Sequence, residues 1–203
     1  MPIIPHRLPD LLRHFAKNPS EARWMSSWLR LRNQSPISAA LPWLPFRITA
    51  MLAREITSQS IVFEYGGGGS TKWFLQRGVR QVTTVEHDAE WLKVLGSALT
   101  PSIRHQMIPV DLAERGGRSY VEAIRDYPDE SIDVVVVDGR HRVDCAEEAA
   151  AKIRRGGILI FDDIDRERYQ DVFRILANWP ATRVDGLCPG KSDLGHVAVF
   201  RKL

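Results

Sequence analysis

The sequence predicts an α/β fold, a Rossmann-like doubly wound sheet of seven mostly parallel strands that ends in an antiparallel strand pair. Two observations predict this fold class. From Ser60 onward, short β-branched or apolar runs alternate with segments of helical periodicity, and parallel strands require such a covering helix at each crossover. In addition, four consecutive glycines follow the first of these runs, where doubly wound sheets bind their ligands.

Residues 1–57 are expected to form an N-terminal helical extension, or cap, in front of a domain at 58–203. Two short helices are predicted between Leu8 and Arg32, then a proline-rich loop, then a helix from Phe46 to Ile56. Aromatic side chains are frequent here, and we expect them to be core, with a lid or a partner surface as alternatives. They are Trp24, Trp28, Trp43 and Phe46.

Strands and helices then follow in regular alternation. The predicted strands are Ser60 to Tyr65, Gln81 to Glu86, Arg104 to Val110, Ile132 to Val137 and Gly157 to Phe161. The predicted helices are Ser70 to Arg77, Ala89 to Leu99, Ser119 to Arg125, Asp144 to Ile153 and Arg168 to Trp179. Two last strands, Ala181 to Gly186 and His196 to Arg201, are joined only by a loop and must be antiparallel neighbours.

The composition narrows the classes of partner. The net charge is +3, but basic and acidic residues are interspersed, so no nucleic-acid partner is expected. No apolar run is long enough to span a bilayer, which predicts a cytoplasmic protein with no membrane partner. Cys145 and Cys188 lack metal-site spacing and are expected to be reduced and structural. A homodimer is left open.

The glycine run Gly66 to Gly69 is expected to be a tight ligand-binding turn. A phosphate-binding P-loop is excluded, because Thr71 to Trp73 lacks its glycine and its magnesium-binding hydroxyl. The dinucleotide fingerprint matches Gly66 and Gly68 but has Thr71 at its third glycine. A nicotinamide-dependent oxidoreductase therefore remains as an alternative.

Acidic residues at the strand ends indicate the ligand. Glu64, just before the glycines, would repel a pyrophosphate and suit a cation. Glu86 ends the second strand and could accept hydrogen bonds from ribose hydroxyls. Asp111 follows the third strand, where it could contact an adenine edge or cap a helix.

At this point the chain resembles the class I S-adenosylmethionine-dependent methyltransferases. Phe63 to Gly68 resembles their first motif and Val85 to Asp88 their second, while Ser70 stands where a further glycine is frequent. The resemblance implies S-adenosylmethionine as the cofactor. The cofactor-binding residues it implies are Glu64, Gly66, Gly67, Gly68, Ser70, Glu86, His87, Asp111 and Asp138.

A second resemblance bears on the chemistry. Val137 to His141 and Phe161 to Asp163 are similar to motifs of the magnesium-dependent O-methyltransferases that act on sugar hydroxyls of natural products. This implies Mg²⁺ at Asp138, Asp162 and Asp163, since adjacent parallel strands end on one edge and Mg²⁺ prefers carboxylates. His141 and Asp138 would then be catalytic, with His141 taking the proton of a small-molecule hydroxyl.

Simpler roles remain open for the same residues. Asp162 or Asp163 could cap the following helix, Asp138 could contact only the cofactor's ammonium group, and His141 could pair with Asp144. The acceptor could also present nitrogen instead of oxygen. A non-catalytic module that binds a ligand or a partner protein is the third hypothesis, after the methyltransferase and the oxidoreductase.

Overall fold

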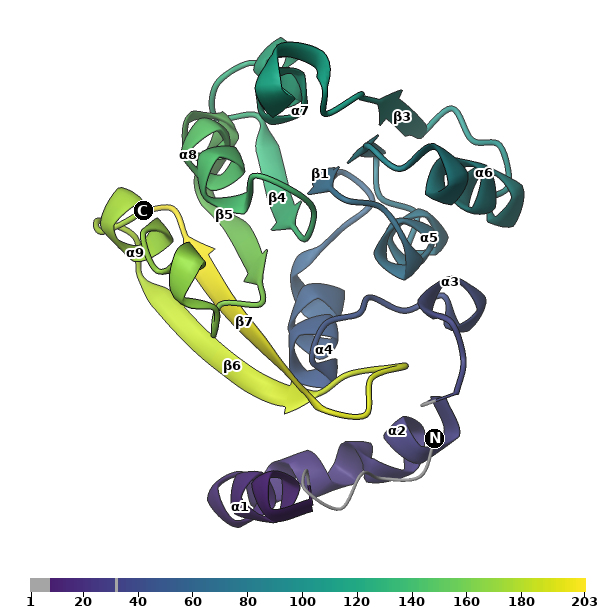
Figure 1. Cartoon of the computed structure of the whole chain (residues 1–203), viewed down its shortest axis with the longest axis vertical. Coiled ribbons are helices and arrows are strands. Elements are labelled where there is room, and N and C mark those ends of the chain that lie inside the picture. The colour runs from purple at the N-terminus through teal and green to yellow at the C-terminus, as the bar shows by residue number, and fades with distance from the viewer. Residues whose placement is uncertain (1–7, 32) are drawn as a thin grey trace.

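The computed structural model describes residues 8–31 and 33–203, and Figure 1 shows their arrangement. Seven strands form one sheet in the order β3-β2-β1-β4-β5-β7-β6. They are β1 (Ile61–Tyr65), β2 (Gln81–Glu86), β3 (His105–Pro109), β4 (Ile132–Val137), β5 (Ile153–Asp162), β6 (Ala181–Leu187) and β7 (Leu194–Arg201). Only β7 is antiparallel to its neighbours, β5 and β6. The predicted fold class is confirmed.

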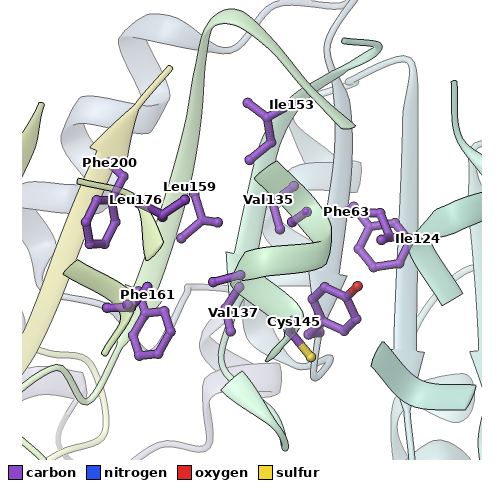
Figure 2. Packing of buried hydrophobic residues seen from close by; sticks show 14 of the residues in the cluster. Phe63, Ile124, Val135, Val137, Cys145, Ile153, Leu159, Phe161, Leu176 and Phe200 are labelled. Atoms are coloured by element: carbon purple, nitrogen blue, oxygen red, sulfur yellow. The ribbon is translucent and has the colours of Figure 1, made fainter. Parts of the chain in front are cut away.

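Helices connect the parallel strands. The main ones are α5 (Gly69–Gln76), α6 (Ala89–Ala98), α7 (Arg118–Glu122) and α8 (Arg142–Lys152), with short 3₁₀ turns η3 (Glu114–Gly117) and η4 (Ala123–Asp126) flanking α7. Side chains alternate between the two faces along each strand. Phe63 and Val135 therefore enter one buried cluster (Figure 2) while Val62 and Val134 enter another. The sheet is thus buried on both faces.

The N-terminal segment forms α1 (Leu8–Lys17), η2 (Pro19–Trp24), α2 (Met25–Leu31), α3 (Pro36–Ala39) and α4 (Phe46–Glu55). A small cluster that includes Leu11, Trp28 and Phe46 packs it against Leu187 at the end of β6. Trp28 and Phe46 are thus core, whereas Trp43 is 42% exposed. Residues 1–7 and Arg32, part of the predicted extension, lie outside the described residues.

One predicted helix is wrong. The segment expected to run as a single helix from Arg168 to Trp179 contains only η5 (Glu167–Tyr169) and α9 (Val172–Ile175). Leu176 leaves the helical conformation at φ −101° and ψ 31°, where its side chain is buried in the core. No helix in the described part of the chain is long and apolar enough to cross a membrane.

The strand order places the site. β1 and β4 are neighbours at the centre of the sheet, and the chain proceeds from β1 outward to β2 but from β4 outward to β5. The loops after β1 and β4 consequently diverge from each other at the carboxyl edge. This topological switch point is where open α/β sheets bind ligands.

Candidate functional site

A cavity of about 490 Å³ opens at this switch point. Most of the predicted site residues lie in its wall, which includes Gly66, Gly67, Gly68, Ser70, Glu86, His87, Asp138, Asp162 and Asp163. The wall also contains Trp43, for which the sequence left a lid role open, and Lys191 from the last loop of the chain. Residues for which the sequence gave no site role line it too, among them Trp91, Arg142 and Arg166. Three of the predicted residues, Glu64, Asp111 and His141, are not in this wall.

The glycine turn is held tightly against β2. Gly66 has φ +91°, a conformation that favours glycine, and its N–H donates to the Val85 carbonyl at 2.9 Å. The carbonyl of Gly67 accepts from Trp91 Nε1 at 2.7 Å, and a Cβ at Gly67 would collide with the Thr84 side chain. The turn is therefore a fixed, bare backbone surface that a ligand can approach closely.

Glu86 lies at the end of β2 beside this turn. Its carboxylate accepts from the backbone N–H groups of Gly67 at 3.3 Å, His87 at 2.7 Å and Asp88 at 3.0 Å. His87 Nδ1 also lies 2.8 Å from Glu86 Oε1, and its Nε2 accepts from Arg140 Nε at 3.2 Å. Glu86 is thus an oriented anion at the edge of the cavity.

Glu64 is placed behind the turn instead of in the cavity. It is fully buried, and Thr84 Oγ1 donates to its Oε2 at 3.3 Å. Burial raises the pKa of Glu64 to about 7, and the hydroxyls of Ser70, Thr71 and Thr84 partly offset that effect. Glu64 therefore lies behind the glycine turn and does not line the cavity, so this placement gives it no direct contact with a ligand there.

The start of α5 is crowded on one side by the α3 region. Helix N-termini attract phosphates through their free N–H groups. At Gly69, however, a Cβ would collide with the carbonyl oxygens of Pro36 and Leu41, so the α3 region packs directly on this helix end. The Gly68 N–H is taken by Thr71 Oγ1 at 3.1 Å. A pyrophosphate at this helix end would therefore meet the carbonyl oxygens of Pro36 and Leu41 beside Gly69.

Asp111 is exposed, and its side chain bonds to a nearby backbone group. Its carboxylate accepts from the Ala113 N–H at 2.8 Å. This contact spans two residues in a turn and does not cap the following helical turn η3, whose N-cap is Ala113. The structure also does not bring the Asp111 side chain to the cavity.

Asp138, Asp162 and Asp163 do converge, but around a guanidinium group. Arg142, in the first turn of α8, lies 3.0 Å from Asp138 Oδ1, 3.5 Å from Asp162 Oδ2 and 3.2 Å from Asp163 Oδ2. Its side chain is 9% exposed. Burial and the neighbouring Asp162 charge raise the pKa of Asp138 well above its ordinary value, while Arg142 acts in the opposite direction.

The expected magnesium site at Asp138, Asp162 and Asp163 is not supported. Within residues 8–31 and 33–203, no group of three or more His, Cys, Asp or Glu side chains is arranged to hold a metal ion. Mg²⁺ requires near-octahedral oxygens at about 2.0–2.1 Å, whereas here the carboxylates face Arg142. The residues present therefore do not fit the metal.

His141 faces a different hollow. It adopts φ +48° at the start of α8, and its imidazole packs against Gly117 in a second cavity with Glu122 and Glu148. Its Nδ1 lies 3.8 Å from Asp144 Oδ2, the pairing considered as the alternative. The expected role of His141 as the base is not supported by this position, because a proton acceptor must lie within reach of the acceptor group.

Lys191, from the loop between β6 and β7, also lines the cavity. Its Nζ lies 3.9 Å from Asp162 Oδ2 and 5.9 Å from the ring centre of Trp43, and its carbonyl accepts from Trp28 Nε1 at 2.7 Å. The sequence offered only its loop position as a signal. For Arg142, the sequence shows only that a basic residue follows the strand-end residue Asp138 by four positions.

Comparisons with known proteins address the fold. No known family matches the sequence, and no curated protein matches it either. Solved structures do match. An rRNA methylase from Streptococcus thermophilus has a TM-score of 0.58 at 18% identity, over 78% of this chain and 96% of that one. A precorrin-6y C5,15-methyltransferase from Geobacter metallireducens gives 0.55 at 10% identity, over 77% and 88%.

A spermidine synthase from Thermotoga maritima also matches, with a TM-score of 0.56 at 14% identity, over 78% of this chain and 59% of that one. Identities this low concern the fold and not the reaction. The strand order, the single antiparallel strand β7 and these neighbours agree. The chain therefore has the fold of the class I S-adenosylmethionine-dependent methyltransferases.

Proposed function

We propose that this protein is an S-adenosylmethionine-dependent methyltransferase that acts on a hydroxyl group of a small molecule. The observation that carries the proposal is the pairing of the bare glycine turn with the oriented carboxylate of Glu86 in one cavity wall. A nucleoside needs such a surface for close approach and such an anion for its ribose hydroxyls.

The residues fit this cofactor at both ends. Glu86 would accept hydrogen bonds from the ribose, and Gly66 to Gly68 would lie along the amino-acid portion, whose cationic groups suit a wall that also contains Asp138. When bound, S-adenosylmethionine supplies an activated methyl group for transfer. Every other contribution must come from the protein's own side chains.

Asp162 is the residue best placed to hold the acceptor. It is 2% exposed, lies in the cavity wall, and its Oδ1 is buried without a hydrogen-bond partner among the described residues. A buried carboxylate oxygen without a partner is unfavourable. A hydroxyl of the acceptor could donate to the Asp162 carboxylate, which would direct the hydroxyl oxygen toward the methyl group. The O–CH3 bond would then form as the S–CH3 bond of the cofactor breaks, with S-adenosylhomocysteine as the leaving group, and the hydroxyl proton would pass to the Asp162 carboxylate.

The charge pattern favours a small acceptor over a nucleic acid. Arg142 and Lys191 approach acidic side chains, and Arg166 Nη2 lies 2.7 Å from Asp163 Oδ2. Nucleic-acid binding relies on cations that neutralise phosphates. Arg142, Lys191 and Arg166 are thus paired with carboxylates, which disfavours phosphate binding along this part of the wall. The nicotinamide alternative is disfavoured by the oxygens of Pro36 and Leu41 at the start of α5.

Calorimetry with S-adenosylmethionine, S-adenosylhomocysteine and NADH tests the cofactor. Saturable binding of the first two, with none of NADH, is expected. Binding of NADH alone would overturn the proposal in favour of the oxidoreductase. Transfer of a labelled methyl group to a panel of sugars, phenols and amines then tests the acceptor, and transfer only to amines would overturn the hydroxyl assignment.

A further inference from the structure

The cluster at the carboxyl ends of β4 and β5 is organised by one arginine. The guanidinium of Arg142 donates to three backbone carbonyls: Nε to Gly139 at 3.0 Å, Nη1 to Asp162 at 2.7 Å and Nη2 to Asp138 at 3.4 Å. It also forms ion pairs, Nη1 with the Asp163 carboxylate at 3.2 Å and Nη2 with the Asp138 carboxylate at 3.0 Å. Arg142 therefore contacts both loops through their backbone as well as through their carboxylates.

Cationic side chains surround the same carboxyl groups. Arg142, Lys191 and Arg166 each place a nitrogen within 4 Å of at least one carboxyl oxygen of Asp138, Asp162 or Asp163. The buried guanidinium of Arg142 further lies 5.4 Å from the ring centre of Tyr169, a cation–π contact. A divalent ion would have to enter beside a fixed guanidinium and would add two positive charges to a cluster that already holds three cationic side chains.

We propose that Arg142 takes the position of a metal ion in this protein, so that a side-chain cation instead of Mg²⁺ holds the Asp138, Asp162 and Asp163 carboxylates together. Arg142 is then a positioning residue. It fixes the loops after β4 and β5 through their carbonyl groups as well as through their carboxylates, which a metal bound only to the carboxylates would not do. Removing the guanidinium should leave an oxygen cage that binds divalent cations.

Titration with Mn²⁺ and Mg²⁺, followed by calorimetry and by the Mn²⁺ spin-resonance signal, tests this without any methyl acceptor. The intact protein should show no saturable site at these carboxylates. Arg142→Ala should instead show a saturable Mn²⁺ site of about one ion per chain, since charged oxygen ligands set the affinity for such ions. The double variant Arg142→Ala with Asp162→Asn should lose that binding.

Arg166→Ala is the matched control, because it also removes an arginine paired with Asp163 but leaves Arg142 in the centre. It should create no site. Arg142→Gln serves if Arg142→Ala does not fold. Stoichiometric Mn²⁺ binding by the intact protein that Asp162→Asn abolishes would overturn the inference, as would a folded Arg142 variant that binds no metal. The test does not depend on the proposed function, which cofactor calorimetry decides separately.

Discussion

The hydroxyl of Tyr120 lies so close to Gly139 that a Cβ at Gly139 would collide with it. Tyr120 is fully buried, and its hydroxyl has no partner with hydrogen-bond geometry among the described residues. Gly139 follows Asp138 in the cavity wall. The ring of Tyr120 therefore sets the path of the loop that carries Asp138.

A pair of substitutions tests that contact. Gly139→Ala should destabilise the protein by roughly 1–3 kcal/mol, as overpacking does, while Tyr120→Phe should change stability by less than about 1 kcal/mol because its hydroxyl has no partner. The double variant should recover part of the loss. Urea unfolding of all four proteins measures the coupling, and strict additivity would show that the two residues do not act on each other.

Glu86→Gln should weaken S-adenosylmethionine binding about tenfold or more. The substitution keeps the shape of the side chain but removes the anion that the ribose hydroxyls would meet, and hydrogen bonds to charged groups contribute about 1.5–3 kcal/mol. Calorimetry measures the affinity. Glu90→Gln, an acidic residue of α6 paired only with Lys93, is the control. Equal affinity in Glu86→Gln and the wild type would remove the assigned role.

Glu64 predicts a particular dependence of stability on pH. Its pKa is about 7 in the folded chain and 4.5 without burial, so the unfolded chain releases this proton first as the pH rises. The free energy of unfolding of the wild type, compared with that of Glu64→Gln, should therefore fall between about pH 4.5 and pH 7. The total fall should be up to roughly 3 kcal/mol, with no further change above pH 7. Urea unfolding at about pH 5 and pH 8 measures the gap. A gap of the same size at both values would contradict the argument.

His141→Ala should bind S-adenosylmethionine as the wild type does, because the imidazole faces the second cavity with Gly117. His141→Asn is the companion variant, since asparagine tolerates the positive φ of this position. Calorimetry compares the three affinities. A loss of about tenfold or more in both variants would mean that His141 reaches the cofactor after all.

Most strands could be predicted closely because their residues are β-branched and end at glycine or acidic residues, but β5 begins at Ile153, four residues before the predicted start at Gly157. Ile132 to Val137, for example, is β4 without change of bounds. The helix expected from Arg168 to Trp179 failed because its apolar spacing fits a helix, whereas burial of Leu176 breaks the segment after one turn. Local pattern does not reveal such a tertiary override.

The site could be predicted in its positions but not in its orientations. Strand ends indicated Glu86, Asp138 and Asp162, and all three line the cavity. The left-handed conformation of His141 turns its side chain away, and no residue pattern announces that. The role of Arg142 depends on how far a first-turn side chain of α8 reaches between two strands, which only the packed structure shows.

The hydrogen bond from Trp28 to Lys191 joins residues 163 positions apart. Trp28 emerges early during synthesis, but its partner lies in the loop between the last two strands, so α2 cannot make this contact until that loop has formed. Contacts of such separation form late, because the intervening loop must first be ordered. A ribosome-bound chain without its last strands would consequently contain the glycine turn and Glu86 but not Lys191, and its cavity would lack the part of the lining that Lys191 supplies.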